Sequence, residues 1–140
     1  MTKISILGII GCFGAVISNA FGGFNNAFIT LLIFMLADYF TGLIVAGVFH
    51  TSPKTPTGGL ESKAGWKGLA RKFATLILII IAVRVDMLMG TGYLKDCVII
   101  GFIVNESLSI IENVGLMGVP LPAVLVKAID VLNEKSDKNV

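Results

Sequence analysis

The sequence predicts an all-α membrane protein with about four transmembrane helices and a short cytoplasmic amphipathic helix near its C-terminal end. Of its 140 residues, 55% are hydrophobic and only 14% are charged, whereas a soluble domain is typically about a quarter charged. Apolar runs long enough to cross ~30 Å of hydrocarbon recur along the chain. Polar turns rich in glycine, asparagine or proline separate these runs. We therefore expect a single membrane domain over residues 1–140.

The first two predicted spans cover residues 4–24 and 27–49. In the first run, Gly8, Gly11 and Gly14 recur every three residues. This spacing fits a close contact face between helices, which favours a true span. Glycine also lowers helix propensity, so a weak or re-entrant segment is the alternative. The second run has the length and the continuous apolar character of a span.

A basic cytoplasmic loop is predicted over residues 50–72, and its second half carries most of the cations. One interpretation is a short helix lying in the membrane interface, with Ser62 as its N-cap. The other is an irregular basic loop with a tryptophan at headgroup depth. Both interpretations make the same side chains membrane-interface anchors, namely Lys63, Trp66, Lys67, Arg71 and Lys72.

Two more spans are predicted over residues 73–89 and 94–114, joined by a tight turn. Residues 123–135 then resume a helical pattern that is too short and too charged to span. This helix is expected to be amphipathic, and it should pack on the membrane surface or against copies of itself. Its apolar face comprises Val124, Leu125, Ala128, Ile129 and Leu132.

The lysines and arginines predict the orientation of the spans. They concentrate before residue 4, in the loop 50–72 and after residue 114, while the other turns hold only Lys95. Four spans with both termini in the cytoplasm satisfy this distribution. Three spans would put the N-terminus outside, which Lys3 alone opposes weakly.

Three ionisable residues interrupt the second and third runs. Asp38 and Arg84 each lie about 11 residues from the cytoplasmic end of their run, so an ion pair between antiparallel neighbours is possible. Such pairing matters because an isolated charge at a helix centre costs roughly 2.5–3.5 kcal/mol. Alternatively, Arg84 snorkels to the outer face. For Asp86, snorkelling or an interfacial contact is favoured over pairing inside the membrane.

The fourth run contains a polar stripe in an otherwise apolar segment. On a helix the stripe falls within an arc of roughly 120°, and Ser107 points elsewhere. It comprises Asn105, Glu106, Ser109, Glu112 and Asn113. The stripe can line a water-filled pore, hydrogen-bond across subunits, or act as a proton or ion relay.

The depth of these residues separates them into two groups. Asn105, Glu106 and Ser109 lie deep enough to need burial partners, and with Asp38 and Arg84 they are the candidates for pore lining or subunit contact. Glu112 and Asn113 lie nearer the cytoplasmic water. We expect those two to tie the helix end to the turn at residues 118–122.

Nothing in the sequence indicates catalysis, a cofactor, a metal site or a nucleic-acid partner. Phosphate loops, zinc-protease motifs and nucleophile elbows are missing. Cys12 and Cys97 are interpreted as small buried hydrophobic residues. His50 is the single histidine, and one histidine cannot form a metal site.

In the order and spacing of its residues, the chain resembles the toxin-secretion/phage-lysis holin family. Its most specific block is Glu106-Ser107-x-Ser109-Ile110-x-Glu112-Asn113, followed by Gly118-Val119-Pro120-x-Pro122. Arg84 and the glycine-rich first run are not part of the family pattern. The other matching positions are Asp38, Thr41, Gly42, Ser62, Gly65, Gly68, Arg71, Lys72, Val85 and Asp86.

The resemblance implies a small phage or prophage protein of the bacterial inner membrane. Such a protein oligomerises with itself and permeabilises the membrane, so that a muralytic enzyme, or in some systems a toxin, leaves the cytoplasm. Two alternatives from other classes stay open: a small oligomeric ion channel or transporter, and a non-conducting membrane adaptor. Saturable flux of a defined solute would favour the former, and recovery of only a heteromeric partner the latter.

Overall fold

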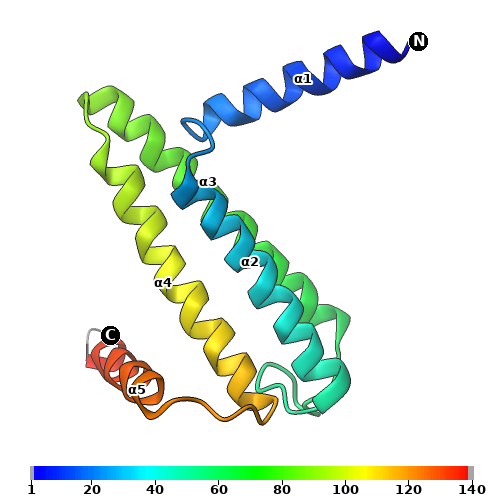
Figure 1. The fold of residues 1–140 in the computed structure, drawn as a ribbon, viewed down its shortest axis with the longest axis vertical. Helices are drawn as coiled ribbons and strands as arrows, with labels where there is room; N and C mark the ends of the chain where they lie inside the picture. The colour runs from blue at the N-terminus through cyan, green and yellow to red at the C-terminus, as the bar shows by residue number, and fades with distance from the viewer. Residues whose placement is uncertain (1, 139–140) are drawn as a thin grey trace.

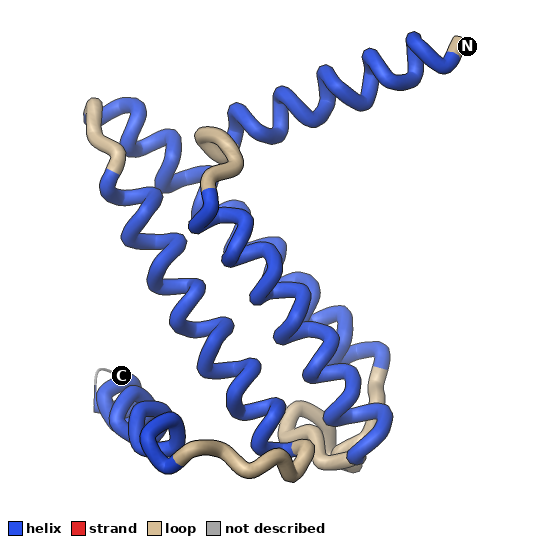
Figure 2. The backbone as a smooth tube through the Cα atoms, in the orientation of Figure 1, coloured by secondary structure: helices blue, strands red, loops and turns tan. Residues whose placement is uncertain are grey.

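The computed structural model describes residues 2–138, and every regular element among them is helical. The elements are α1 (Lys3–Ala20), α2 (Asn26–Ile44), the π-helix η1 (Val45–Phe49), α3 (Ser62–Met89), α4 (Tyr93–Leu116) and α5 (Ala123–Lys138). Helices α2, α3 and α4 lie side by side as a bundle (Figure 1). Helix α1 projects away from one end of this bundle, and α5 lies off it near the other (Figure 2). The predicted all-α class is confirmed.

Three segments are long and apolar enough to cross a membrane, namely α1, α2 with η1, and α4. Helix α3 is not among them, because its 28 residues join the basic segment to an apolar half that contains Arg84 and Asp86. At ~1.5 Å per residue, α3 is roughly 42 Å long, which exceeds the ~30 Å of hydrocarbon. The predicted fourth span is therefore not established by length and composition, and it stays a proposal.

The basic segment differs most from the prediction. Residues 62–72 are the beginning of α3 and run without a break into its apolar half, so the loop is confined to residues 50–61. Residues 62–72 therefore form neither the separate interfacial helix nor the irregular loop that the sequence predicted. Ser62 is the first helical residue rather than the cap, since Glu61 occupies the N-cap position without a side-chain cap bond.

The other helix ends follow ordinary local rules. The side chain of Asn25 accepts a hydrogen bond of 2.9 Å from the Phe28 amide and caps α2. Helix α2 continues as η1 until His50, whose φ of 53° is left-handed and stops the helix. Gly90, with a φ of 67°, ends α3 in the same way. The second and fourth runs thus match their predicted limits closely.

The apolar core lies in the half of the bundle nearer the two tight turns. It is built from Phe28, Leu31, Met35, Ile79, Val83 and Ile99. On α2 and α3 these residues are three, four or seven positions apart, which places them on one face, and α4 contributes Ile99 alone. Helix α1 contributes no buried residue. An apolar core thus holds α2, α3 and α4 together at one end, whereas at the loop end the buried apolar residues are Val45 and Ala46 of η1.

Two smaller predictions have mixed outcomes. Cys12 and Cys97 are exposed, so their interpretation as buried side chains is wrong. A helix is present at α5 and extends to Lys138, but its amphipathic character and its place on the membrane surface stay predictions. The side chains of Ile129 and Leu132, which belong to its predicted apolar face, lie outside those that the structure describes.

Candidate functional site

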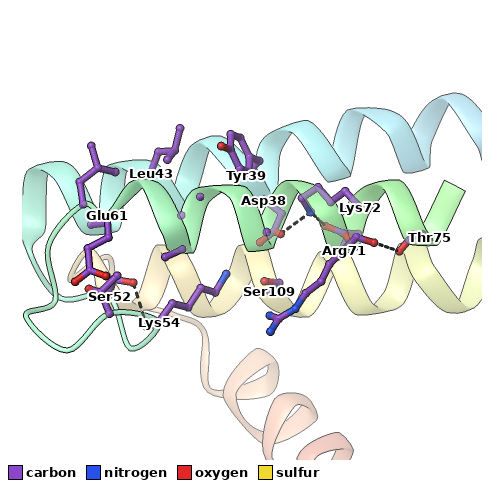
Figure 3. A pocket seen from close by; sticks show the side chains of 18 of the residues that line it. Asp38, Tyr39, Leu43, Ser52, Lys54, Glu61, Arg71, Lys72, Thr75 and Ser109 are labelled. Atoms are coloured by element: carbon purple, nitrogen blue, oxygen red, sulfur yellow. Dashed lines mark hydrogen bonds and ion pairs between the residues drawn. The ribbon is translucent and has the colours of Figure 1, made fainter.

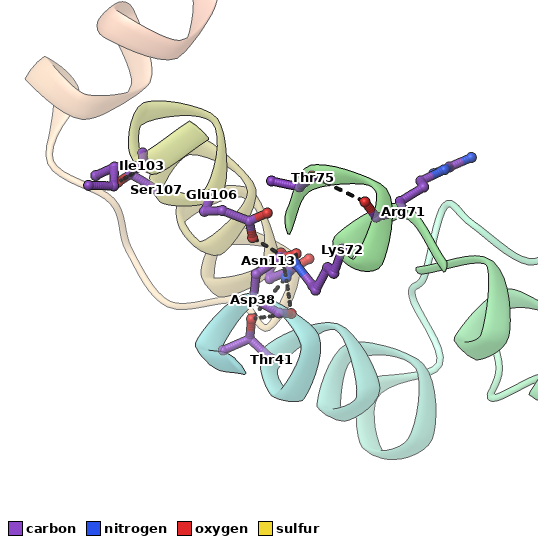
Figure 4. Close-up of polar contacts among 9 residues, drawn as sticks. All are labelled: Asp38, Thr41, Arg71, Lys72, Thr75, Ile103, Glu106, Ser107 and Asn113. Carbon is purple, nitrogen blue, oxygen red and sulfur yellow. Dashed lines mark hydrogen bonds and ion pairs between the residues drawn. The ribbon is translucent and has the colours of Figure 1, made fainter. Parts of the chain in front are cut away.

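An ionic cluster joins the three bundle helices in the half that the apolar core does not fill. The Lys72 Nζ atom on α3 lies 2.7 Å from Oδ2 of Asp38 on α2 and 2.7 Å from Oε2 of Glu106 on α4 (Figure 4). One ammonium group therefore bridges two carboxylates that come from different helices. The cluster carries the net charge of one carboxylate when all three groups are ionised.

Asn113 completes the cluster from the next turns of α4. Its Nδ2 atom donates to Oδ1 of Asp38 at 3.1 Å, to the Asp38 carbonyl at 3.2 Å and to Oγ1 of Thr41 at 2.9 Å. Thr41 in turn donates to the Asp38 carbonyl. The side chain of Asn113 lies beside Gly42, where an added Cβ would stand 3.8 Å from Nδ2. Asp38 is thereby held by an ammonium on one oxygen and an amide on the other.

Burial makes these contacts important. Asp38, Glu106 and Asn113 are 8%, 6% and 5% exposed. Charges separated from water are costly unless they are paired and hydrogen-bonded. Among the described residues, every fully enclosed side-chain nitrogen and oxygen atom has a hydrogen-bond partner. Glu106 and Asn113, the buried members of the polar stripe, therefore find their partners within one chain.

A cleft of about 300 Å³ opens beside the cluster at the loop end of the bundle (Figure 3). Ser52 and Lys54 of the loop line one part of it, and Asp38, Lys72 and Glu106 line the deeper part. Asn105, Ser109 and Arg71 contribute further polar side chains. The arrangement gives water a route to the cluster from the loop side.

A second polar clamp fastens the opposite end of the bundle. Asp86 accepts hydrogen bonds from the amides of Leu94 and Lys95, at 3.1 and 2.8 Å, and from the Thr91 hydroxyl at 2.7 Å. It therefore caps the first turn of α4 from α3. The Lys95 ammonium donates to the carbonyls of Gly22 and Gly23 in the turn after α1. Asp86 is 4% exposed in this turn, so it does not snorkel, and the other predicted alternative, an interfacial contact, stays a prediction.

Arg84 does not pair with Asp38 as the sequence suggested. It is exposed in the turn-side half of α3, and its Nη1 atom contacts Sδ of Met87 at 3.4 Å. The predicted pairing compared the distances of Asp38 and Arg84 from the cytoplasmic ends of their runs, and it took Phe73 as the start of the third run. The helix begins eleven residues earlier, at Ser62. Asp38 lies eleven residues from the end of η1 at Phe49, and Lys72 lies ten residues from the true start of α3 at Ser62. Antiparallel packing therefore brings Lys72, not Arg84, level with Asp38.

The stripe of α4 is also divided differently from the prediction. Glu106 is buried in the cluster, Ser109 is half-buried in the cleft wall, and Asn105 is exposed at the cleft. Asn113 contacts α2 rather than the turn at residues 118–122, so the role expected for its side chain is wrong. Glu112 is exposed.

The remaining family positions have local roles. Gly65 and Gly68 face Tyr39 on α2, and an added Cβ would stand 3.4 Å from its hydroxyl and 3.8 Å from its ring, which are ordinary van der Waals distances. Ser107 donates to the Ile103 carbonyl of its own helix at 2.6 Å, as expected for a residue off the stripe. Gly118 has a φ of 82°, and Pro120 and Pro122 lie in the linker before α5.

Among the predicted interface anchors, Lys72 stands apart. Lys63, Trp66, Lys67 and Arg71 are exposed, whereas the Lys72 side chain is 14% exposed and points into the bundle. A pattern in the sequence distinguishes it: Lys72, Ile79 and Asp86 are spaced by seven residues. Ile99, Glu106 and Asn113 repeat this spacing on α4. A seven-residue spacing marks one buried face, so each polar residue continues an apolar stripe.

Comparison with known proteins agrees with this architecture. A model of the bacteriophage holin family matches residues 15–134. The uncharacterized protein Lin0175 of Listeria innocua is 40% identical over 137 residues, which are 97% of this chain and 91% of that protein. An uncharacterized 14.9 kDa protein in the nagH 3′ region of Clostridium perfringens is 33% identical, with 87% and 88% of the two chains covered.

One relative has a functional name. The probable holin of Bacillus phage phi105 is 31% identical over 109 residues, which are 77% of this chain and 75% of that protein. No solved structure matches the chain. The matched range, residues 15–134, includes the ionic cluster and the clamp at the opposite end of the bundle. These residues are Asp38, Lys72, Glu106 and Asn113 in the cluster, and Asp86 and Lys95 in the clamp. The chain therefore belongs to the bacteriophage holin family and is a holin-type membrane protein.

Proposed function

We propose that this protein oligomerises in the bacterial inner membrane and permeabilises it, so that a muralytic enzyme or a toxin leaves the cytoplasm. The family match and the probable holin of phage phi105 support this proposal. The observation that carries it is the polar stripe of α4, in which Glu106 and Asn113 are buried inside a helix long and apolar enough to span. Side chains of this kind in a membrane helix mark a water-filled or subunit-facing surface.

In this proposal the chain crosses the membrane four times, with both termini in the cytoplasm. The apolar half of α3 supplies the fourth span and runs beside α2 and α4. In support, the loop 50–61, the cationic start of α3 and the C-terminal end of α4 lie at the same end of the bundle (Figure 1). Lysine and arginine favour the cytoplasmic side, so this end is assigned to the cytoplasm.

The proposed pore or subunit-contact residues are Asn105, Glu106, Ser109, Asp38 and Arg84. Asn105 and Arg84 are exposed in the single chain, so they are available to a neighbour. Asp38, Glu106 and Ser109 line the cleft and become available only when the bundle rearranges. In a ring of identical subunits the same face of each chain meets the axis, so one stripe per chain suffices to line a pore.

Induced expression in bacteria tests this function. The wild-type protein should stop growth and collapse the membrane potential, and Glu106→Leu should change the timing or the extent of the leak. Glu112→Leu is the matched control, because it removes an exposed carboxylate from the same helix. Normal potential at high levels of the wild-type protein in the membrane would refute the proposal.

A further inference from the structure

The loop-side half of α3, residues 62–78, covers the ionic cluster without a fully buried apolar side chain, and only Leu76 near its end packs, half-buried, against the apolar core. All buried residues of α3 lie in its other half, at Ile79, Ala82, Val83 and Asp86. That turn-side half is fixed by the apolar core and by the cap that Asp86 provides to α4. The two halves of one helix are therefore held in different ways.

Leu76 fastens one end of the loop-side half to the apolar core, and other contacts hold the rest of it. Lys72 makes its two ion pairs with α2 and α4, and the glycines at 65 and 68 pack against Tyr39. Because glycine has no side chain, these two positions add no side-chain contact from α3. The ion pairs are thus the only salt bridges between helices among the described residues.

The cleft lies beside these ion pairs, so we expect the loop-side half of α3 to separate from α2 and α4 at this point. The cleft lies beside Lys72, so water from the loop side can replace the partners of each charge. Movement of the loop-side half would uncover Asp38, Glu106 and Ser109 together, since all three line the same cleft. The apolar core at the other end would stay closed during this movement.

We propose that Lys72 is a positioning residue that latches the loop-side half of α3 over the polar stripe. Breaking its two ion pairs releases this half and exposes Asp38, Glu106 and Ser109 to water or to a neighbouring subunit. The latch concerns the fold of one chain. Its consequence for permeabilisation rests on the function proposed above.

Reactivity of one cysteine in the cleft measures the opening directly. Ser109→Cys is introduced with Cys12→Ser and Cys97→Ser, and the protein is placed in phosphatidylethanolamine–phosphatidylglycerol nanodiscs. A charged maleimide then labels residue 109 at a rate that follows exposure. Lys72→Met should raise this rate by about tenfold, which corresponds to about 1.4 kcal/mol of lost latching.

Two controls separate the latch from a general loss of charge. Lys72→Arg keeps the cation, and Lys67→Met removes an exposed cation of the same helix that lies outside the cleft. Both should label at a rate close to that of the parent protein. Equal rates for Lys72→Met and Lys67→Met would overturn the latch.

A charge exchange keeps the test decisive when Lys72→Met folds poorly. Lys72→Glu should open the cleft, because it sets a third carboxylate against Asp38 and Glu106. Adding Glu106→Lys restores an oppositely charged pair between α3 and α4 and should return slow labelling. A double variant that labels as fast as Lys72→Glu would show that ion pairing is not what holds α3.

Timing in cells connects the latch to the proposed function. Lys72→Met should permeabilise the membrane earlier after induction than the wild-type protein or Lys67→Met. A wild-type protein that never permeabilises would refute the proposed function and leave the labelling result standing. Faster labelling without earlier permeabilisation would refute the link between the two.

Discussion

At the scale of single residues, the cluster shows how a membrane bundle holds polar side chains. Two carboxylates share the Lys72 ammonium, and the neutral amide of Asn113 satisfies the remaining oxygen of Asp38. Removing one partner of a buried ion pair is strongly destabilising, since it leaves the other charge without compensation. The residues of the cluster therefore depend on one another more than on the surrounding apolar packing.

Asn113→Ala should destabilise the bundle by about 1–3 kcal/mol, because Asp38 and Thr41 lose their shared donor in a buried site. Asn105→Ala removes the same side chain from an exposed position of the same helix, and its effect should stay within about 0.5 kcal/mol. Unfolding in mixed detergent micelles measures both. Equal losses would mean that the Asn113 contacts contribute nothing specific.

Two residues of the ionic cluster, Asp38 and Glu106, can be recognised from the sequence, whereas their partner Lys72 cannot. Asp38 and Glu106 are conspicuous because they interrupt apolar runs, and burial of these two was predicted. Lys72 was not identified as their partner because it follows Arg71 in a cationic segment. The neighbours differ by about 100° around the helix, and this rotation alone sends one side chain to solvent and the other inward.

At the scale of elements, the start of α3 decides which side chains meet. Sequence composition changes sharply near residue 73, but composition does not end a helix. Glycine at 65 and 68 lowers helix propensity, yet this segment is helical, and both glycines face Tyr39 of α2. The start of α3 therefore lies at Ser62 and not at Phe73. This difference changes which residue of α3 lies at the same depth as Asp38.

The turn between α3 and α4 is stabilised by hydrogen bonds to the carboxylate of Asp86. Asp86→Ala should cost about 1–2 kcal/mol, because the amides of Leu94 and Lys95 lose the carboxylate that caps them. Asp96→Ala removes an exposed carboxylate from the first turn of α4 and loses only a charge–dipole effect of about 0.3–1 kcal/mol.

Hydrogen exchange distinguishes these two variants locally. The amides of Leu94 and Lys95 should exchange faster in Asp86→Ala and stay protected in Asp96→Ala. Unchanged protection in Asp86→Ala would contradict a capping role for this residue.

At the scale of the whole molecule, the largest apolar cluster lies in the turn-side half of the bundle and the ionic cluster lies in the loop-side half. The length of the apolar runs was sufficient to predict the helices apart from the start of α3, because a run long enough to cross hydrocarbon can be recognised without knowledge of its neighbours. The pairing of α2 with α4, and the placement of Lys72 between them, depend on contacts far apart in the chain. No local pattern in one run specifies those contacts.

Helix α1 lies outside the cooperative unit that the other helices form. Ile79 is 0% exposed in the core, whereas Ile9 on α1 is 60% exposed. Ile79→Ala should therefore cost about 2–5 kcal/mol of bundle stability through lost packing and a cavity. Ile9→Ala deletes the same atoms and should change bundle stability by no more than about 0.5 kcal/mol.

Unfolding of both variants in detergent, at a concentration where the protein is monomeric, compares the two positions. Equal losses would mean that α1 packs against the bundle. A loss for Ile9→Ala that appears only at higher protein concentration would place α1 between chains. A loss confined to Ile79→Ala would establish that α2, α3 and α4 unfold as one unit and that α1 takes no part in it. Lipid or a second chain is then what covers the apolar surface of α1, because no residue of this helix is buried within a single chain.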